Sequence, residues 1–171
     1  MERTKSTVGN QKGVHVMKNS KPVLLVEDDN VDAMTVKRAF KDLKLTNNLV
    51  HHVNGEEALA YLQGPDVSLP CVILLDLNMP RMNGIEFLKV TKKDDTLKQI
   101  PVIVLTTSNE ECDVVDSFRL CVAGYIVKPV DYKKFVEAIR TIDLYWTLSE
   151  LPDCEGGVKH EESETVTTGR G

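Results

Sequence analysis

The sequence predicts an α/β protein with a doubly wound, five-stranded parallel sheet and helices on both of its faces. Short apolar runs alternate five times with segments whose apolar residues recur near helical spacing, and the connections are short. Three of the runs are continuously apolar, which is typical of parallel strands that helices cover on both sides. The alternation and the unbroken runs together indicate this fold class.

Each predicted strand is followed by a predicted helix. The strands are expected over residues 22–28, 48–53, 71–76, 101–108 and 124–129. The helices are expected over residues 29–43, 54–64, 84–94, 109–121 and 131–151. Asp29 or Asn30 can cap the first helix, because either side chain accepts hydrogen bonds from the N–H groups at a helix start. Gly64 is a typical end for the second helix.

The two ends of the 171-residue chain differ in composition from its middle. Residues 1–20 are polar and show no hydrophobic period, so we expect a flexible N-terminal leader. Residues 152–171 are polar and glycine-rich, so we expect a disordered tail. The folded domain is expected over residues 21–151, a length that can bury roughly two thirds of its unfolded surface.

Charge and cysteine content narrow the class of protein. The net charge of -5 argues against a nucleic-acid partner. No apolar stretch approaches the ~18 residues of a membrane span, and no secretory signal begins the chain. Cys71, Cys112, Cys121 and Cys154 show no C-x-x-C spacing, and three of them lie among apolar residues, so we expect buried, reduced thiols. These features indicate a cytoplasmic protein.

Polar groups end four of the five predicted strands. Glu27 and Asp28 end the first, Asp76 ends the third, Thr106 comes at the end of the fourth and Lys128 at the end of the fifth. In doubly wound sheets, ligands bind beyond the carboxyl ends of the strands. We therefore expect three carboxylates, a hydroxyl group and an ammonium group to converge at one edge of the sheet.

Such a cluster favours a divalent cation and a phosphoryl group. Neighbouring carboxylates repel one another, and Mg²⁺, which prefers carboxylate, water and phosphate oxygens, relieves that repulsion. Asp76 can then act as a nucleophile and form an acyl phosphate, with Lys128 neutralising charge and Thr106 donating its hydroxyl to a phosphoryl oxygen. Each signal taken alone also has an ordinary structural explanation, as a helix cap or a turn.

The order of these motifs resembles the receiver domains of two-component response regulators, over about residues 21–150. The stretches that carry the resemblance are "LLVEDDN", "LLDLNMPRMNGIEFL", "IVLTTS" and "GYIVKP". The resemblance implies a flavodoxin-like receiver fold with strand order 2-1-3-4-5. It also implies phosphorylation by a histidine kinase.

The resemblance further assigns a role to each site residue. Asp76 is implied as the phosphoacceptor and as a Mg²⁺ ligand. Asp28 is implied as a direct ligand, Glu27 as a ligand mainly through water, and Asn78 as a ligand through its backbone carbonyl. Thr106 and Tyr125 resemble the residue pair that switches conformation, and Lys128 the lysine that pairs with the phosphate.

The C-terminal part of the chain narrows the resemblance to a subfamily. "YIVKPVDYKKF" followed by "LYWTLSELP" is similar to single-domain regulators that serve phytochrome-type histidine kinases. The chain departs from the family in the loop before the fifth strand, where the family usually has Gly-Ala and this chain has Cys121 and Val122. The departure leaves the residues of the site unchanged.

The expected function is that of a stand-alone response regulator that signals by a conformational switch and partner binding. It is not expected to be an enzyme beyond its own phosphorylation and dephosphorylation. One alternative is a receiver-like module that binds partners without phosphorylation. An aspartyl-nucleophile phosphohydrolase is disfavoured because Asn78 stands where such enzymes usually have a second acid. A flavodoxin-like cofactor module is disfavoured because "EDDN" would repel a phosphate.

The last predicted helix carries two apolar stripes. Phe135, Ile139, Ile142 and Trp146 form one stripe suited to packing on the sheet. A second stripe lies roughly opposite and consists of Leu144, Leu148 and Leu151. We expect a homodimer through this helix and the fifth strand, against the alternative that the second stripe only covers the edge of the domain.

Overall fold

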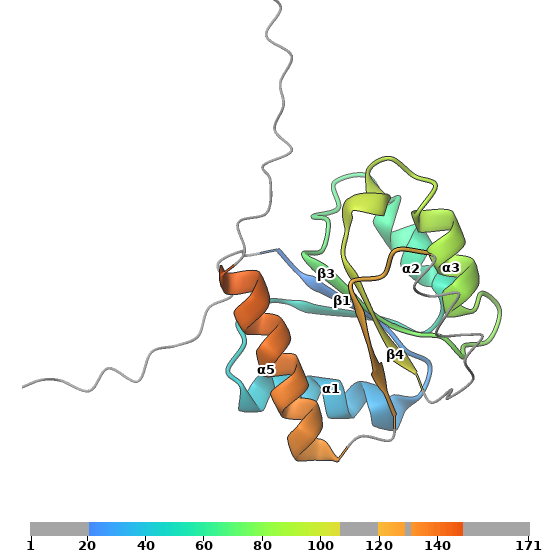
Figure 1. The fold of residues 1–171 in the computed structure, drawn as a ribbon. Helices are drawn as coiled ribbons and strands as arrows, with labels where there is room; N and C mark the ends of the chain where they lie inside the picture. The colour runs from blue at the N-terminus through green and yellow to red at the C-terminus, as the bar shows by residue number, and fades with distance from the viewer. Residues whose placement is uncertain (1–20, 107–119, 129–130, 149–171) are drawn as a thin grey trace, which may run out of the picture.

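The computed structural model describes residues 21–106, 120–128 and 131–148, and its centre is a five-stranded parallel sheet (Figure 1). The strands are β1 (Val23–Val26), β2 (Leu49–His52), β3 (Val72–Asp76), β4 (Val102–Thr106) and β5 (Gly124–Val127). Their order in the sheet is β2-β1-β3-β4-β5, so the predicted fold class and strand order are confirmed. The predicted leader, tail and most of the predicted fourth helix lie outside the described residues.

Helices cover both faces of this sheet. They are α1 (Asn30–Asp42), α2 (Gly55–Leu62), α3 (Gly84–Thr91) and α5 (Tyr132–Leu148), with a short 3₁₀ turn, η1, at Leu97–Gln99. Figure 1 shows α1 and α5 on one face and α2 and α3 on the other. The predicted third helix, 84–94, is three residues too long, because the Asp94 carboxylate accepts hydrogen bonds from the N–H groups of Thr96 and Leu97 and so begins the next turn.

Alternate residues of β1, β3 and β4 enter different hydrophobic cores, because successive side chains of a strand point to opposite faces. Leu24 and Val26 of β1 lie in the core beneath α2 and α3. Val23 and Leu25 lie in the core beneath α1 and α5. The predicted stripe of α5 that faces the sheet includes Phe135 and Ile139, which are both buried, and the half-buried Ile142; the Trp146 side chain is not among those described.

Helix α1 begins directly after β1 because Asp29 caps it. The Asp29 carboxylate accepts hydrogen bonds from the N–H groups of Val31, at 2.7 Å, and Asp32, at 3.0 Å. Such a cap satisfies donors that have no partner inside the helix. The short connection keeps Glu27 and Asp28 at the edge of the sheet.

The loop before β5 holds one deviation from expectation. Cys71 is buried as predicted, but Cys121 is exposed. Cys121 lies in a turn with a φ of 56°, in the left-handed region that favours glycine, and this turn directs its side chain outward rather than into a core. Cys112 and Cys154 lie outside the described residues.

Among the described helices, none has the length and apolar character that crossing a membrane requires.

Candidate functional site

Three carboxylates meet at the carboxyl edge of the sheet. Glu27 and Asp28 follow β1, Asp76 is the last residue of β3, and these two strands pair side by side. One carboxylate oxygen from each of the three lies within 4.8 Å of the others. Glu27 and Asp76 are buried, whereas Asp28 is exposed. The pairing of β1 with β3 therefore brings residues about fifty positions apart in sequence together in one acidic cluster.

The donor set of this cluster fits a hard divalent cation. All three donors are carboxylate oxygens, which suit Mg²⁺ or Mn²⁺ better than softer metals. Two of the carboxylates are shielded from water, so ionising both of them is costly and a cation beside them lowers that cost. The exposed Asp28 lies on the solvent side, where water or phosphate oxygens can complete the coordination.

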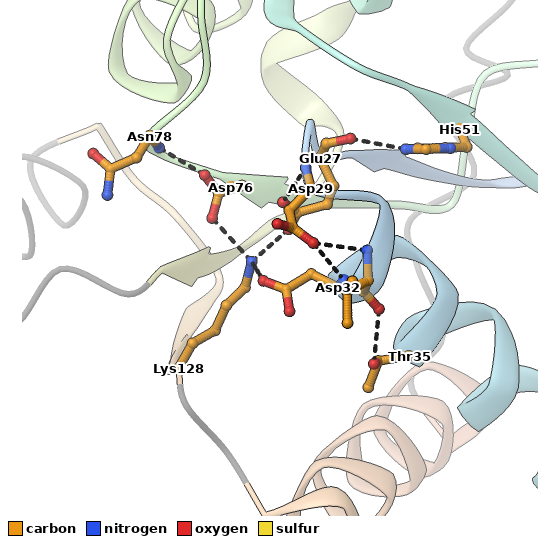
Figure 2. Close-up of polar contacts among 9 residues, drawn as sticks. Glu27, Asp29, Asp32, Thr35, His51, Asp76, Asn78 and Lys128 are labelled. Carbon is orange, nitrogen blue, oxygen red and sulfur yellow. Dashed lines mark hydrogen bonds and ion pairs between the residues drawn. The ribbon is translucent and has the colours of Figure 1, made fainter.

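Lys128, the residue after β5, reaches the same cluster (Figure 2). Its Nζ atom donates hydrogen bonds to Glu27 Oε2, to Asp32 Oδ2 at 2.7 Å and to Asp76 Oδ1 at 3.1 Å. Burial raises the pKa of Glu27 to about 7, although the hydrogen bond and positive charge of Lys128 act in the opposite direction. The ammonium group thus compensates only part of the negative charge at this edge.

Asp76 is held in place by the backbone that follows it. The Asn78 N–H donates to Asp76 Oδ2 at 2.7 Å, and the Gly84 N–H donates to the Leu77 carbonyl at 3.0 Å. A Cβ atom at Gly84 would lie 2.4 Å from the Asp76 carbonyl oxygen. Only a glycine lets α3 begin so close to the end of β3, so the loop is folded tightly against the candidate phosphoacceptor.

Glu27 is fixed by two neighbouring segments. The Asp29 N–H donates to Glu27 Oε1 at 3.1 Å. His51 of β2 lies with Nε2 2.8 Å from the Glu27 carbonyl oxygen, so this nitrogen carries the proton (Figure 2). The first contact orients the Glu27 carboxylate, and the second holds the backbone from which that side chain projects.

The other predicted residues are placed less completely. Thr106 is the last residue of β4, but its side chain is not among those described. Tyr125 lies in β5, with 44% of its surface exposed. Leu144 and Leu148 lie on α5 with side chains that are likewise not described, and Leu151 lies beyond the described residues.

Asp32 is a residue of this site that the sequence reasoning missed. It lies in the first turn of α1, four positions after Asp28, and contacts Lys128 directly. The available signal was its position, because the first turn of a helix that follows a strand lies over the same edge of the sheet as the strand end.

Comparisons with known proteins agree with this geometry. Residues 23–140 match the family model of the response regulator receiver domain. The chain is 37% identical over 130 residues to the response regulator Rcp1 from Synechocystis, covering 74% of this chain and 88% of that protein. A solved Mn²⁺-bound form of Rcp1 is 36% identical with a TM-score of 0.67, covering 77% of this chain and 97% of that one.

Two further solved structures are similar. The phosphorylated cyanobacterial phytochrome response regulator RcpA is 37% identical with a TM-score of 0.70, covering 77% of this chain and 98% of that one. The bacteriophytochrome response regulator RtBRR is 44% identical with a TM-score of 0.62, covering 72% of this chain and 77% of that one. The sheet order, the acidic cluster beside Lys128 and the match over most of the chain lead to one conclusion: this protein belongs to the response regulator receiver domain family of two-component signalling.

Proposed function

We propose that this chain accepts a phosphoryl group on Asp76 from a histidine kinase, in a reaction that depends on Mg²⁺, and signals through the resulting change of conformation and partner binding. The observation that carries the proposal is the meeting of Asp76 with Glu27, Asp28 and Lys128 at one edge of the sheet. A buried carboxylate with a cation site on one side and an ammonium group beside it suits nucleophilic attack on phosphorus.

The transfer itself requires few groups from the chain. One Asp76 carboxylate oxygen forms a bond to phosphorus as the phosphorus–nitrogen bond of the kinase's phosphohistidine breaks, and the electron pair of that bond stays on the imidazole. Asp28, Asp76, the Asn78 carbonyl and, through water, Glu27 would hold a Mg²⁺ ion, which would supply positive charge beside the phosphoryl oxygens. Lys128 pairs with a phosphoryl oxygen, and the Asn78 N–H keeps Asp76 oriented.

The signal follows from the charge that phosphorylation adds. A phosphoryl group brings about −1.5 to −2 charges and three acceptor oxygens. Thr106 then donates its hydroxyl to one of these oxygens and vacates space that Tyr125 enters from the surface. The exposure of Tyr125 in this structure supports the proposal, because a side chain that is to move inward must begin outside.

The kinase is proposed to be of the phytochrome type. The support is the similarity to regulators whose names include phytochrome or bacteriophytochrome, together with the C-terminal motifs of this chain. The domain is proposed to extend over 21–151 and to act in the cytoplasm.

We also propose that the protein forms a homodimer through α5 and β5. An apolar groove of about 510 Å³ lies between these elements, lined by residues that include Tyr125, Ala138 and Ile142. Leu144, Leu148 and Leu151 are the proposed contacts of the helix itself. A groove of this character between the edge strand and the last helix is suited to contact with a second apolar surface.

Phosphorylation is tested with acetyl phosphate as the donor. The parent protein should gain one phosphoryl group in the presence of Mg²⁺, detected by intact-mass spectrometry, and should gain none after EDTA treatment. Asp76→Asn should remain unlabelled, whereas Asp66→Asn, at an exposed position in the turn between α2 and the start of β3, should label like the parent. An unlabelled parent protein would instead favour a module that binds partners without phosphorylation.

A further inference from the structure

Asp32 connects the first turn of α1 to Lys128 across the candidate site. Its Oδ2 atom accepts a hydrogen bond from Lys128 Nζ at 2.7 Å (Figure 2). The Asp32 side chain is 39% exposed and that of Lys128 is 12% exposed. Because the acid lies on the solvent side of the lysine, it can be altered without opening either hydrophobic core.

The hydrogen-bonding capacity of Lys128 is fully used in this arrangement. An ammonium group has three N–H donors, and Glu27, Asp32 and Asp76 each accept one of them. Two of these acceptors, Glu27 and Asp76, also belong to the carboxylate cluster suited to a cation, whereas Asp32 does not. A cation in the cluster therefore attracts Glu27 and Asp76, which also bind Lys128. Asp32 is then the only one of the three acceptors of Lys128 that does not also face the cation.

We propose that Asp32 is a positioning residue that competes with the phosphoryl group for the ammonium of Lys128. This proposal rests on the proposed function, since it assigns Asp32 a part in the same phosphoryl site. With the cation bound, a phosphoryl oxygen near Asp76 must share Lys128 with the Asp32 carboxylate. Asp32 thereby weakens the hold on the phosphoryl group and sets how much of the protein is in the switched state.

Lys128 stays charged in this site, so its partners compete for its N–H donors and the proposal needs no change in its protonation. Burial by itself lowers the pKa of Lys128, but the hydrogen bonds to Asp32 and Glu27 and the negative charge of Asp76 hold that pKa well above its ordinary value. The lysine accordingly stays protonated whichever partner it has. What changes between states is the distribution of its three donors.

Asp32 also has a simpler structural explanation. A carboxylate in the first turn of a helix interacts favourably with the helix dipole, so Asp32 could act only by stabilising α1. In that case its removal would lower the free energy of unfolding and leave the binding of a phosphoryl mimic unchanged. The two explanations therefore differ in a measurable quantity.

The test compares beryllofluoride affinities at saturating Mg²⁺ and fixed ionic strength, using two-dimensional NMR titrations of the full chain. Asp32→Asn should bind beryllofluoride about threefold more tightly than the parent, a change of the size that a partly exposed ion pair produces. Asp32→Glu, which restores the charge, should return toward the parent affinity. Asp29→Asn is the matched control, since it removes the same charge nearby, keeps the helix cap and has its carboxylate on the α1 N–H groups rather than on Lys128.

A second measurement reports on the ion pair itself. The ¹H–¹⁵N signal of the Lys128 ammonium group in the Mg²⁺-bound protein should shift clearly more in Asp32→Asn, which loses a hydrogen bond to it, than in Asp29→Asn, which loses only a more distant charge. If Asp32→Asn binds beryllofluoride no more tightly than Asp29→Asn, the competition is absent while phosphoryl binding stands. If the parent itself does not bind beryllofluoride, the proposed function and this inference both fail.

Discussion

At the scale of single residues, the carboxyl group of Glu27 shows how burial lets a proton compete with a cation at this site. Glu27 is 1% exposed, and burial raises its pKa from the ordinary 4.5 to about 7, despite its hydrogen bond with Lys128. Near neutral pH the metal-free protein therefore holds a proton on much of its Glu27. A divalent cation that enters the cluster must displace this proton.

The raised pKa of Glu27 predicts a pH dependence of stability in EDTA. Between pH 4.5 and about 7 the unfolded chain loses this proton while the folded protein keeps it, so the free energy of unfolding falls as pH rises. The contribution is complete below pH 4.5 and is lost above about 7, and it amounts to about 3 kcal/mol at most.

Urea denaturation of the parent and Glu27→Gln across this pH range measures the effect. The difference in free energy of unfolding between the two proteins should change across the window in favour of the glutamine variant, because glutamine does not titrate. Parallel curves for the two proteins would contradict the raised pKa.

Two residues show what the sequence did not reveal at this scale. Asp32 was missed because the sequence does not show which side chain in the first turn of α1 points toward Lys128. The two residues lie almost a hundred positions apart in the chain. The unusual Cys121 was noticed as a departure from the family, but its exposed, left-handed conformation was not predicted. A φ of 56° also explains why a glycine is common there, since glycine adopts this conformation without steric cost.

At the scale of elements, the junction between β3 and α3 is the tightest constraint around Asp76. An added Cβ at Gly84 would meet the Asp76 carbonyl oxygen and, at 2.8 Å, the Leu77 Cα, both of them backbone atoms. Backbone atoms cannot turn aside as a side chain can. The start of α3 and the position of Asp76 are therefore set by one residue without a side chain.

Gly84→Ala should lower the free energy of unfolding by about 2 kcal/mol or more, because overpacking forces the backbone to shift. It should also slow labelling by acetyl phosphate, since the shift moves Asp76. Gly124→Ala is the matched control, because a Cβ at Gly124 would meet nothing within 4 Å. Urea denaturation and the labelling rate test both statements, and equal stabilities for the two variants would contradict the clash.

The elements themselves were largely predictable from sequence. Unbroken apolar runs marked β1, β3 and β4 because both faces of these strands are covered, and the order of strands came from the family resemblance. Helix ends were less predictable. The second helix was expected over 54–64 and runs over Gly55–Leu62, because Asn54 is its N-cap and Gln63, just before Gly64, is its C-cap.

At the scale of the whole molecule, the surface formed by β5 and α5 is the proposed contact with a second copy. The groove between these two elements is mostly apolar, and β5 is an edge strand of the sheet. An edge strand beside an apolar groove favours association, because a second copy that binds there covers the strand edge and the groove together. The proposed dimer thus depends on this surface.

Light scattering at micromolar concentrations should give twice the monomer mass for the parent protein. Leu148→Glu should shift the protein toward the monomer, because it places a charge on the proposed contact of α5. Val90→Glu on α3, at a position that is exposed on the other face of the sheet, should leave the mass unchanged. A parent protein that scatters as a monomer would rule out this dimer.

The sheet also separates the interior into two cores, and no buried residue among those described belongs to both. Neighbouring residues of one strand therefore pack in different cores: Leu24 lies beneath α2 and α3, and Leu25 lies beneath α1 and α5. A substitution at one of these neighbours removes packing directly from one layer of helices and reaches the other layer only through the backbone of the strand that both layers share.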